Sequence, residues 1–132
     1  MTTELERGGI FTKIHLKSYL KDLTNDITTS INTNAIQTKD KLSYYIDQEK
    51  YILKIVSPTK LILNRSTSEI DSSLYFQESK ILPSTYTIKE SNLSLSIDIR
   101  TNKIEINNNY IKISYTVIDS NNDYEYYIEM SE

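Results

Sequence analysis

The sequence predicts an all-β fold, a single closed antiparallel barrel of about 8–10 strands. Apolar and polar residues alternate along most of the chain, and clusters of Asn, Asp, Ser or Lys interrupt the alternation about every ten residues. No long helix is indicated. Successive side chains of a strand point to opposite faces, so each alternating segment has one face to bury. A two-sheet sandwich fits the same pattern, but a closed barrel leaves no exposed edges.

The first half of the chain contains five segments of this kind. Polar turns are expected near residues 24–26, 38–41 and 48–50, and Pro58 ends a strand because proline cannot donate to a ladder. The residues expected to face inward are Ile14, Leu16, Ser18 and Leu20; Ile27, Thr29, Ile31, Thr33 and Ala35; Leu42, Tyr44 and Ile46; Tyr51, Leu53 and Ile55; and Leu61, Leu63 and Arg65.

The second half continues the pattern. Segment 68–82 is the nearest candidate for a helix, but strand alternation fits it at least as well. Asn107–Asn109 is expected to form a turn, since Asn tolerates positive φ and can replace the scarce glycines. The inward residues are Ile70, Ser72, Leu74 and Phe76; Tyr86 and Ile88; Leu93, Leu95, Ile97 and Ile99; Ile104 and Ile106; Ile111, Ile113, Tyr115 and Val117; and Tyr124, Tyr126, Ile128 and Met130.

Size and composition limit the classes of function. The 132 residues suit one domain, with a flexible segment at 1–10 and the barrel at 11–132. The absence of Cys excludes thiol catalysis, iron–sulfur clusters and disulfides, and no motif indicates another metal site or a cofactor. A net charge of −3 disfavours non-specific nucleic-acid binding. Without a secretory signal or a stretch of roughly 20 apolar residues, we expect a cytoplasmic protein that does not enter membranes.

Segment 61–101, LILNRSTSEIDSSLYFQESKILPSTYTIKESNLSLSIDIRT, resembles the YwiB-like proteins, a bacterial family of unknown function. The shared features are an apolar strand ending in Arg65, the Leu74/Phe76 pair, the Tyr86–Thr87 step and an alternating strand that closes at Thr101. Segments 42–45 and 113–115 also fit, and the likeness extends from Ile14 to Met130. The resemblance implies a lipocalin-like (calycin-like) barrel and carries no established activity.

Arg65 is the most informative candidate for a binding residue. It shares its face with Leu61 and Leu63, and a buried guanidinium must be paired or it costs several kcal/mol. It is therefore either a receptor for a ligand carboxylate or anion, or a structural clamp that packs on a Tyr at one end of the barrel. Thr33, Ser72 and Tyr86 also face inward and could contact a ligand, although Thr and Ser are also common fillers of strand positions.

Other side chains give weaker signals. His15, the single histidine, is expected on the wet face without a catalytic or metal-binding partner. The clustered tyrosines either form an aromatic platform or pack across strands. We therefore expect no catalytic residue and no cofactor, and a non-enzymatic role in binding a small, partly apolar molecule inside the barrel. A protein-interaction or structural module that uses the outer surface is the alternative, an enzyme ranks third, and the oligomeric state stays open.

Overall fold

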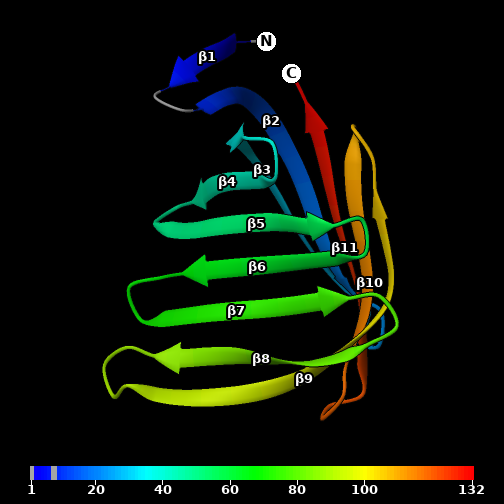
Figure 1. Cartoon of the computed structure of the whole chain (residues 1–132). Coiled ribbons are helices and arrows are strands. Elements are labelled where there is room, and N and C mark those ends of the chain that lie inside the picture. Colours follow the sequence, from blue (N-terminus) through cyan, green and yellow to red (C-terminus); the bar gives the residue numbers. More distant parts are fainter. Residues whose placement is uncertain (1, 7–8) are drawn as a thin grey trace.

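The computed structural model describes residues 2–6 and 9–132, with side chains from residue 11 onward, and this part of the chain contains eleven strands and no helix (Figure 1). The strands are β1 (Thr2–Glu6), β2 (Gly9–Asp22), β3 (Ile27–Gln37), β4 (Lys41–Ile46), β5 (Glu49–Ser57), β6 (Lys60–Ser66), β7 (Ile70–Gln77), β8 (Ile81–Ile88), β9 (Leu93–Ile106), β10 (Tyr110–Val117) and β11 (Asn122–Ser131).

Ten of the strands, β2 to β11, close into an antiparallel barrel. Each strand from β3 to β11 pairs with its neighbour in sequence, and β2 pairs with both β3 and β11, which joins the two ends of the sheet. The short strand β1 pairs with the start of β2. In Figure 1, strands β4–β8 cross in front of β2, β10 and β11, and β9 bends from one set to the other. The predicted all-β closed barrel is thereby confirmed.

The core lies on the face that the alternation assigned to the interior. Leu16, Leu53, Leu61, Phe76 and Ile113 are completely buried. The remaining buried apolar side chains come from the same alternating positions: Ile14, Ala35, Leu42, Tyr44, Leu63, Ile99, Ile104, Ile111, Tyr115, Ile128 and Met130. One continuous cluster therefore joins all the long strands, as a closed sheet requires.

Strand β9 is longer than the sequence indicated. The alternation placed its end at Thr101, but the strand continues to Ile106 as one 14-residue element. Its pairing with β10 shifts so that Ser114 lies opposite Lys103 and Tyr115 opposite Thr101. The additional residue, Asn102, is a β-bulge, and a bulge reverses which side chains face inward. That reversal explains why Thr101 and Ile104 are both buried.

Three apolar inward positions are not covered, and Thr29, which was also expected to face inward, is exposed as well. Ile27, Leu93 and Leu95 were expected to be hidden, but their exposed fractions are 58%, 52% and 51%. They belong to the ends of the β2–β3 and β8–β9 hairpins, and the expectation that every alternate residue from Ile14 to Met130 is buried is wrong there. Alternation reports the face of a strand, whereas burial also needs an opposing wall, and these hairpin ends lack one.

Tight turns are made with few glycines. Five non-glycine residues have positive φ, namely Asp26, Asp47, Ser79, Asn92 and Asn121. The Asn107 turn forms as expected but without this conformation, and its side-chain oxygen accepts bonds from the Asn109 and Tyr110 amides. The helical alternative at 68–82 is replaced by β7, a turn and the start of β8.

The predicted flexible segment 1–10 includes residues 1, 7 and 8, which lie outside the described part of the chain, so its flexibility stays a prediction. Thr2–Glu6 forms β1. Within the described residues, no helix has the length and apolar character needed to cross a membrane.

Two leucine truncations test the closed core against the uncovered hairpin ends. Leu61→Ala removes a completely buried side chain and should lower the free energy of unfolding by about 2–5 kcal/mol. Leu93→Ala removes a half-exposed one and should cost less than about 1 kcal/mol. Urea unfolding followed by tyrosine fluorescence measures both values, and equal losses would contradict the described packing.

Candidate functional site

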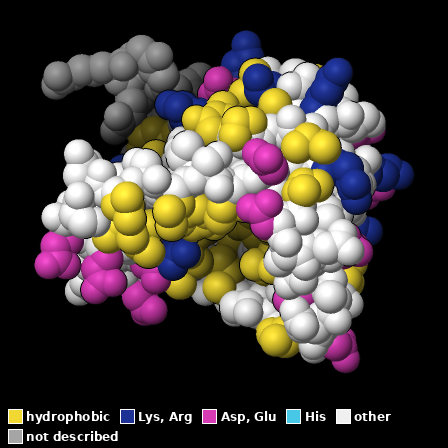
Figure 2. Space-filling view, turned by 90° about the horizontal axis from the view of Figure 1, so that it is seen from below, with side chains coloured by type: hydrophobic (Ala, Val, Ile, Leu, Met, Phe, Trp, Pro, Cys, Tyr) yellow, Lys and Arg dark blue, Asp and Glu magenta, His cyan; other side chains and the backbone are white. Residues whose placement is uncertain are grey.

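A cavity of about 420 Å³ occupies one end of the barrel and opens to solvent. Figure 2 shows the hollow, with hydrophobic side chains inside it and charged side chains at its rim. Most of the lining is aliphatic or aromatic, and Arg65 is its charged member. The lining residues are Ser18, Leu20, Thr29, Ile31, Ile46, Tyr51, Leu63, Arg65, Ser72, Leu74, Phe76, Tyr86, Ile97, Ile99, Tyr115, Val117, Tyr124 and Tyr126.

Three of the four predicted site residues line this cavity together. Ser72 lies directly opposite Arg65 on β6 and directly opposite Tyr86 on β8, so the three form one row across β6, β7 and β8. Their side chains share the inner face because paired residues of antiparallel strands point the same way. The alternation predicted that they share the inner face, and the strand register makes them neighbours.

Thr33 lies elsewhere. It is absent from the cavity lining, and its hydroxyl donates to the Tyr45 carbonyl oxygen at 3.1 Å. The bond ties β3 to β4 just beyond the last paired residues of these strands, Ala35 and Tyr44. Thr33 therefore lies in the wall of the barrel and does not line the cavity.

Arg65 is engaged by an acidic partner at the rim. Its Nε and Nη2 atoms bind the Glu49 Oε1 atom at 2.8 and 2.6 Å, and its guanidinium lies 5.8 Å from the centre of the Tyr51 ring. The Tyr51 hydroxyl donates to the same Glu49 oxygen at 3.0 Å. Arg65 is 40% exposed and Glu49 35%, so water screens this pair. The arrangement has the form of the aromatic-packed clamp that the sequence left as one alternative.

Glu49 was missed because it occupies a stretch that the sequence assigned to a turn. In the structure it begins β5, two residues before Tyr51, and Tyr51 lies opposite Arg65. Diagonal neighbours across two strands are close enough for long side chains to meet. The hydrogen bond from Arg65 holds the pKa of the Glu49 carboxyl below its usual value, and the hydrogen bond from Tyr51 lowers it further.

Tyrosines extend the polar row deeper into the barrel. Tyr44 and Tyr51 stack with ring centres 5.2 Å apart, and the Tyr44 and Tyr126 hydroxyls are 2.8 Å apart. Burial raises the pKa of Tyr44, Tyr115 and Tyr126, so these phenols stay neutral at physiological pH. Tyr115 also stacks on Tyr124 at 5.2 Å. Of the two alternatives for the tyrosines, cross-strand packing describes these contacts.

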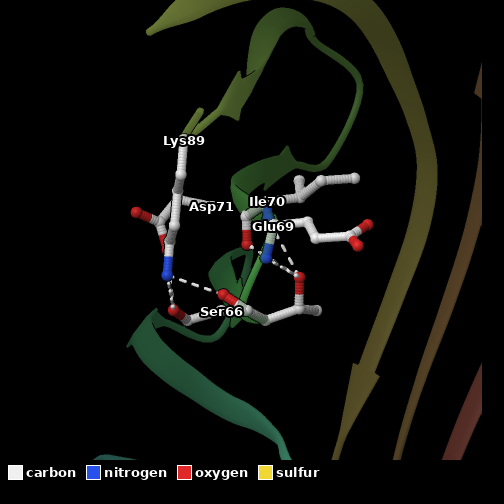
Figure 3. A network of polar contacts seen from close by, with 6 residues as sticks. Ser66, Glu69, Ile70, Asp71 and Lys89 are labelled. Carbon is white, nitrogen blue, oxygen red and sulfur yellow. Dashed lines mark hydrogen bonds and ion pairs between the residues drawn. The ribbon is translucent and has the colours of Figure 1, made fainter. Parts of the chain in front are cut away.

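The turn beside Arg65 is fastened to the next hairpin (Figure 3). The Lys89 ammonium donates to the Thr67 carbonyl oxygen at 2.6 Å and to the Ser66 hydroxyl at 3.3 Å, and it lies 3.5 Å from an Asp71 oxygen. Ser66 in turn donates to Asp71 at 2.7 Å. The β6–β7 turn is therefore held against the end of β8, which fixes one side of the cavity rim.

The histidine lies on the outer wall. The His15 Nδ1 atom is 3.3 Å from the Asn34 side-chain oxygen, on neighbouring strands β2 and β3. Within the described residues, no group of three or more His, Asp or Glu side chains could hold a metal ion.

The architecture has a counterpart among solved structures. No protein-family model matches the sequence, and no curated protein matches it. The crystal structure of YwiB from Bacillus subtilis is similar, with a TM-score of 0.69, 21% sequence identity and coverage of 90% of this chain and 89% of that one. At this identity the likeness shows a shared fold, as the sequence resemblance implied, and it transfers no functional residue.

Substitution of Glu49 tests the rim pair through pH. The lowered pKa of Glu49 means that its stabilisation is present above its unfolded-state pKa, about 4.3, and is lost as the pH falls through the lower folded-state value. Glu49→Gln should therefore reduce the free energy of unfolding by up to about 1 kcal/mol at pH 7 and by almost nothing near pH 3.

Urea titrations at several pH values measure this difference. Glu90→Gln, at an exposed position outside the rim pair, is the matched control and should give a small difference throughout. A Glu49→Gln effect that does not change between pH 7 and pH 3 would contradict the role of the pair.

Proposed function

We propose that the barrel binds a small, mostly apolar molecule in its interior, in the manner of lipocalin-like barrels. The open cavity of about 420 Å³ carries this proposal, because ligand pockets are usually concave, largely apolar and roughly 300–1,000 Å³ in volume. Side chains from both halves of the barrel line it, including Phe76, Ile99 and Tyr115. Transfer of an apolar ligand from water to such a surface contributes roughly 25 cal/mol per Å² buried.

The polar groups of the cavity support a ligand with one weakly polar end. Ser72 and Tyr86 are cross-strand neighbours in the row that begins at Arg65, and both line the cavity, where their hydroxyls are available to hydrogen-bond such a group. Glu49 already neutralises Arg65. A strongly anionic ligand would have to compete with this carboxylate, so a neutral hydroxyl, carbonyl or amide group is the better match.

The chemistry of the lining favours binding over catalysis. A general base needs a pKa near the working pH, and burial moves the pKa of the lining residues Tyr115 and Tyr126 upward, away from that range. These phenols serve as hydrogen-bond groups and as flat apolar surfaces. The proposed role is therefore that of a carrier or sensor of a small molecule.

Filling the cavity tests this function. Ser72→Phe places a ring where a buried small side chain now borders the cavity, and it should weaken binding of an anilinonaphthalene fluorescent probe at least tenfold. Because the ring enters existing space, the midpoint of thermal unfolding should change little. Fluorescence titration and thermal unfolding measure the two effects.

Ser73→Phe is the matched control, since Ser73 follows Ser72 on β7 and bonds Asn64, outside the cavity lining. The control should keep the affinity of the unmodified chain. Equal probe affinity in both variants, or no probe binding by the unmodified chain, would overturn the proposal. Native mass spectrometry of protein purified from its own cells would then identify the retained molecule.

A further inference from the structure

The barrel wall is incompletely paired between β3 and β4. Strand β3 has eleven residues, but only Ala35, Ile36 and Gln37 pair with β4. Strand β4 ends at Ile46, shortly after these pairs. Strand β3 extends beyond them toward its own first residue, Ile27. Among the described residues, segment 27–33 has no partner strand on this side. We call this segment the open edge.

Particular backbone groups are available along the open edge. The Thr38 amide bonds the Lys41 carbonyl across the β3–β4 pair, and the direction of backbone groups alternates along a strand. The N–H and C=O groups of Thr28, Ser30 and Asn32 therefore point away from β2. The odd-numbered residues between them direct their N–H and C=O groups toward β2, and every residue of β3 is in register with β2. The edge thus presents three residues with both groups free, spaced about 7 Å apart.

The open edge lacks the features that usually prevent association. Natural edge strands are protected by charged residues, proline, bulges or short length. Segment 27–33 reads ITTSINT, without a charge, a proline or a glycine. Most of its side chains are exposed. Its Ile and Thr residues have high β propensity, and the segment is suited to accept another strand.

The inner face of such a strand would meet the cavity. Thr29 and Ile31 on β3 line the cavity, and Ile46 and Tyr51 line it from the β4–β5 side of the opening. Ile27 lies on the same face of β3 and is 58% exposed. Every second side chain of an added strand would point toward this apolar surface, and these side chains should therefore be apolar.

The outer face of the added strand would lie near lysines. Lys17 and Lys21 on β2 are in register with Asn32 and Thr28, and the outward residues of β2 and β3 between 13 and 34 include no acid. On the other side of the opening, Lys50 lies over the Tyr45 ring at 6.0 Å. Two strand spacings, about 10 Å, separate β2 from an added strand, which is within reach of lysine and glutamate side chains and close to the Debye length at 0.1 M salt.

Acidic residues lie at the turn end of the open edge, where Asp22 is in register with Ile27 and Asp26 directly precedes it, and on β11. Glu125 is in register with Lys21 but accepts a bond from Tyr19 and pairs with Lys112, and Glu129 is in register with Lys17. The outward face of β2 beside Thr28–Asn32 is therefore positive, although the chain as a whole carries −3.

We propose that the open edge of β3 binds an extended peptide segment by strand addition, with apolar side chains alternating with acidic ones. Main-chain bonds to Thr28, Ser30 and Asn32 provide the attachment, and the alternation provides specificity. A second copy of this chain fits less well, because two β3 edges joined by a twofold axis would place the lysine-bearing faces of both copies on the same side. The inference is separate from the small ligand, which occupies the interior.

The probe is a capped seven-residue peptide with Glu at its odd and Val at its even positions, mixed with the full chain. Residue-resolved amide hydrogen exchange should show at least tenfold slower exchange at Thr28, Ser30 and Asn32, with little change at Thr29 and Ile31. A peptide with Lys in place of Glu should bind at least tenfold more weakly, and added salt should reduce the difference. No protection of the three amides, or equal binding of both peptides, would overturn the proposal.

Two variants isolate the backbone contribution. Ser30→Pro removes one edge donor and should weaken peptide binding at least tenfold, whereas Ser30→Ala removes only the hydroxyl and should leave affinity unchanged. Fluorescence titration with the anilinonaphthalene probe should be unaffected by either variant, which separates this site from the cavity. Equal peptide affinity in the two variants would overturn strand addition.

A peptide methylated on every backbone nitrogen provides the same test without changing the protein. It keeps its side chains and loses its donors, so it should not bind. If it binds as well as the parent peptide, main-chain pairing is excluded. Protection of Thr28, Ser30 and Asn32 that rises with protein concentration in the absence of peptide would instead assign the edge to a second copy and overturn the proposal.

Discussion

The double pairing of β2 is the constraint on which the architecture depends. This 14-residue strand is in register with β11 on one side and with β3 on the other, and it therefore joins the first and last parts of the chain. Once the sheet is closed, the inward positions of all strands face one another. Leu16 at its centre is completely buried. Without this closure the same strands would form an open sheet with two long edges and one uncovered apolar face.

Closure also explains how the candidate site is assembled. Residues far apart in sequence become neighbours because successive strands are in register, as the row Arg65, Ser72 and Tyr86 shows. The row continues across β5 to Tyr51 and across β4 to Tyr44. Polar and aromatic groups thus follow a line perpendicular to the strands, and the apolar cavity lies beside it. A site of this kind needs no sequence motif, since its spacing is set by hairpin lengths.

Much of the fold could be predicted from the sequence because alternation is a local property. The inward positions of β2, β6, β7 and β10 follow from the period of two, as the burial of Leu16, Leu61, Phe76 and Ile113 confirms. The bulge at Asn102 could not be foreseen, since the additional residue is defined by its partner strand β10. Exposure at Leu93 could not be foreseen either, because it depends on where the facing wall ends.

The site was predictable only in part for the same reason. Periodicity placed Arg65, Ser72 and Tyr86 on the inner face, where the structure has them. It also suggested Thr33, whose hydroxyl instead reaches the Tyr45 carbonyl because β3 and β4 separate at that point. Glu49 could have been found by considering diagonal neighbours of Arg65, but only with the β5–β6 register already known.

The turns have a consequence for the unfolded chain. Five of them hold Asp, Asn or Ser at positive φ, a conformation that costs most non-glycine residues about 1–2 kcal/mol. With only two glycines in 132 residues, the disordered chain also explores fewer backbone states than a glycine-rich one. The entropy lost on folding is correspondingly smaller, which offsets part of the local strain. The low glycine content thus affects the free energy of folding through the unfolded chain as well as through the folded barrel.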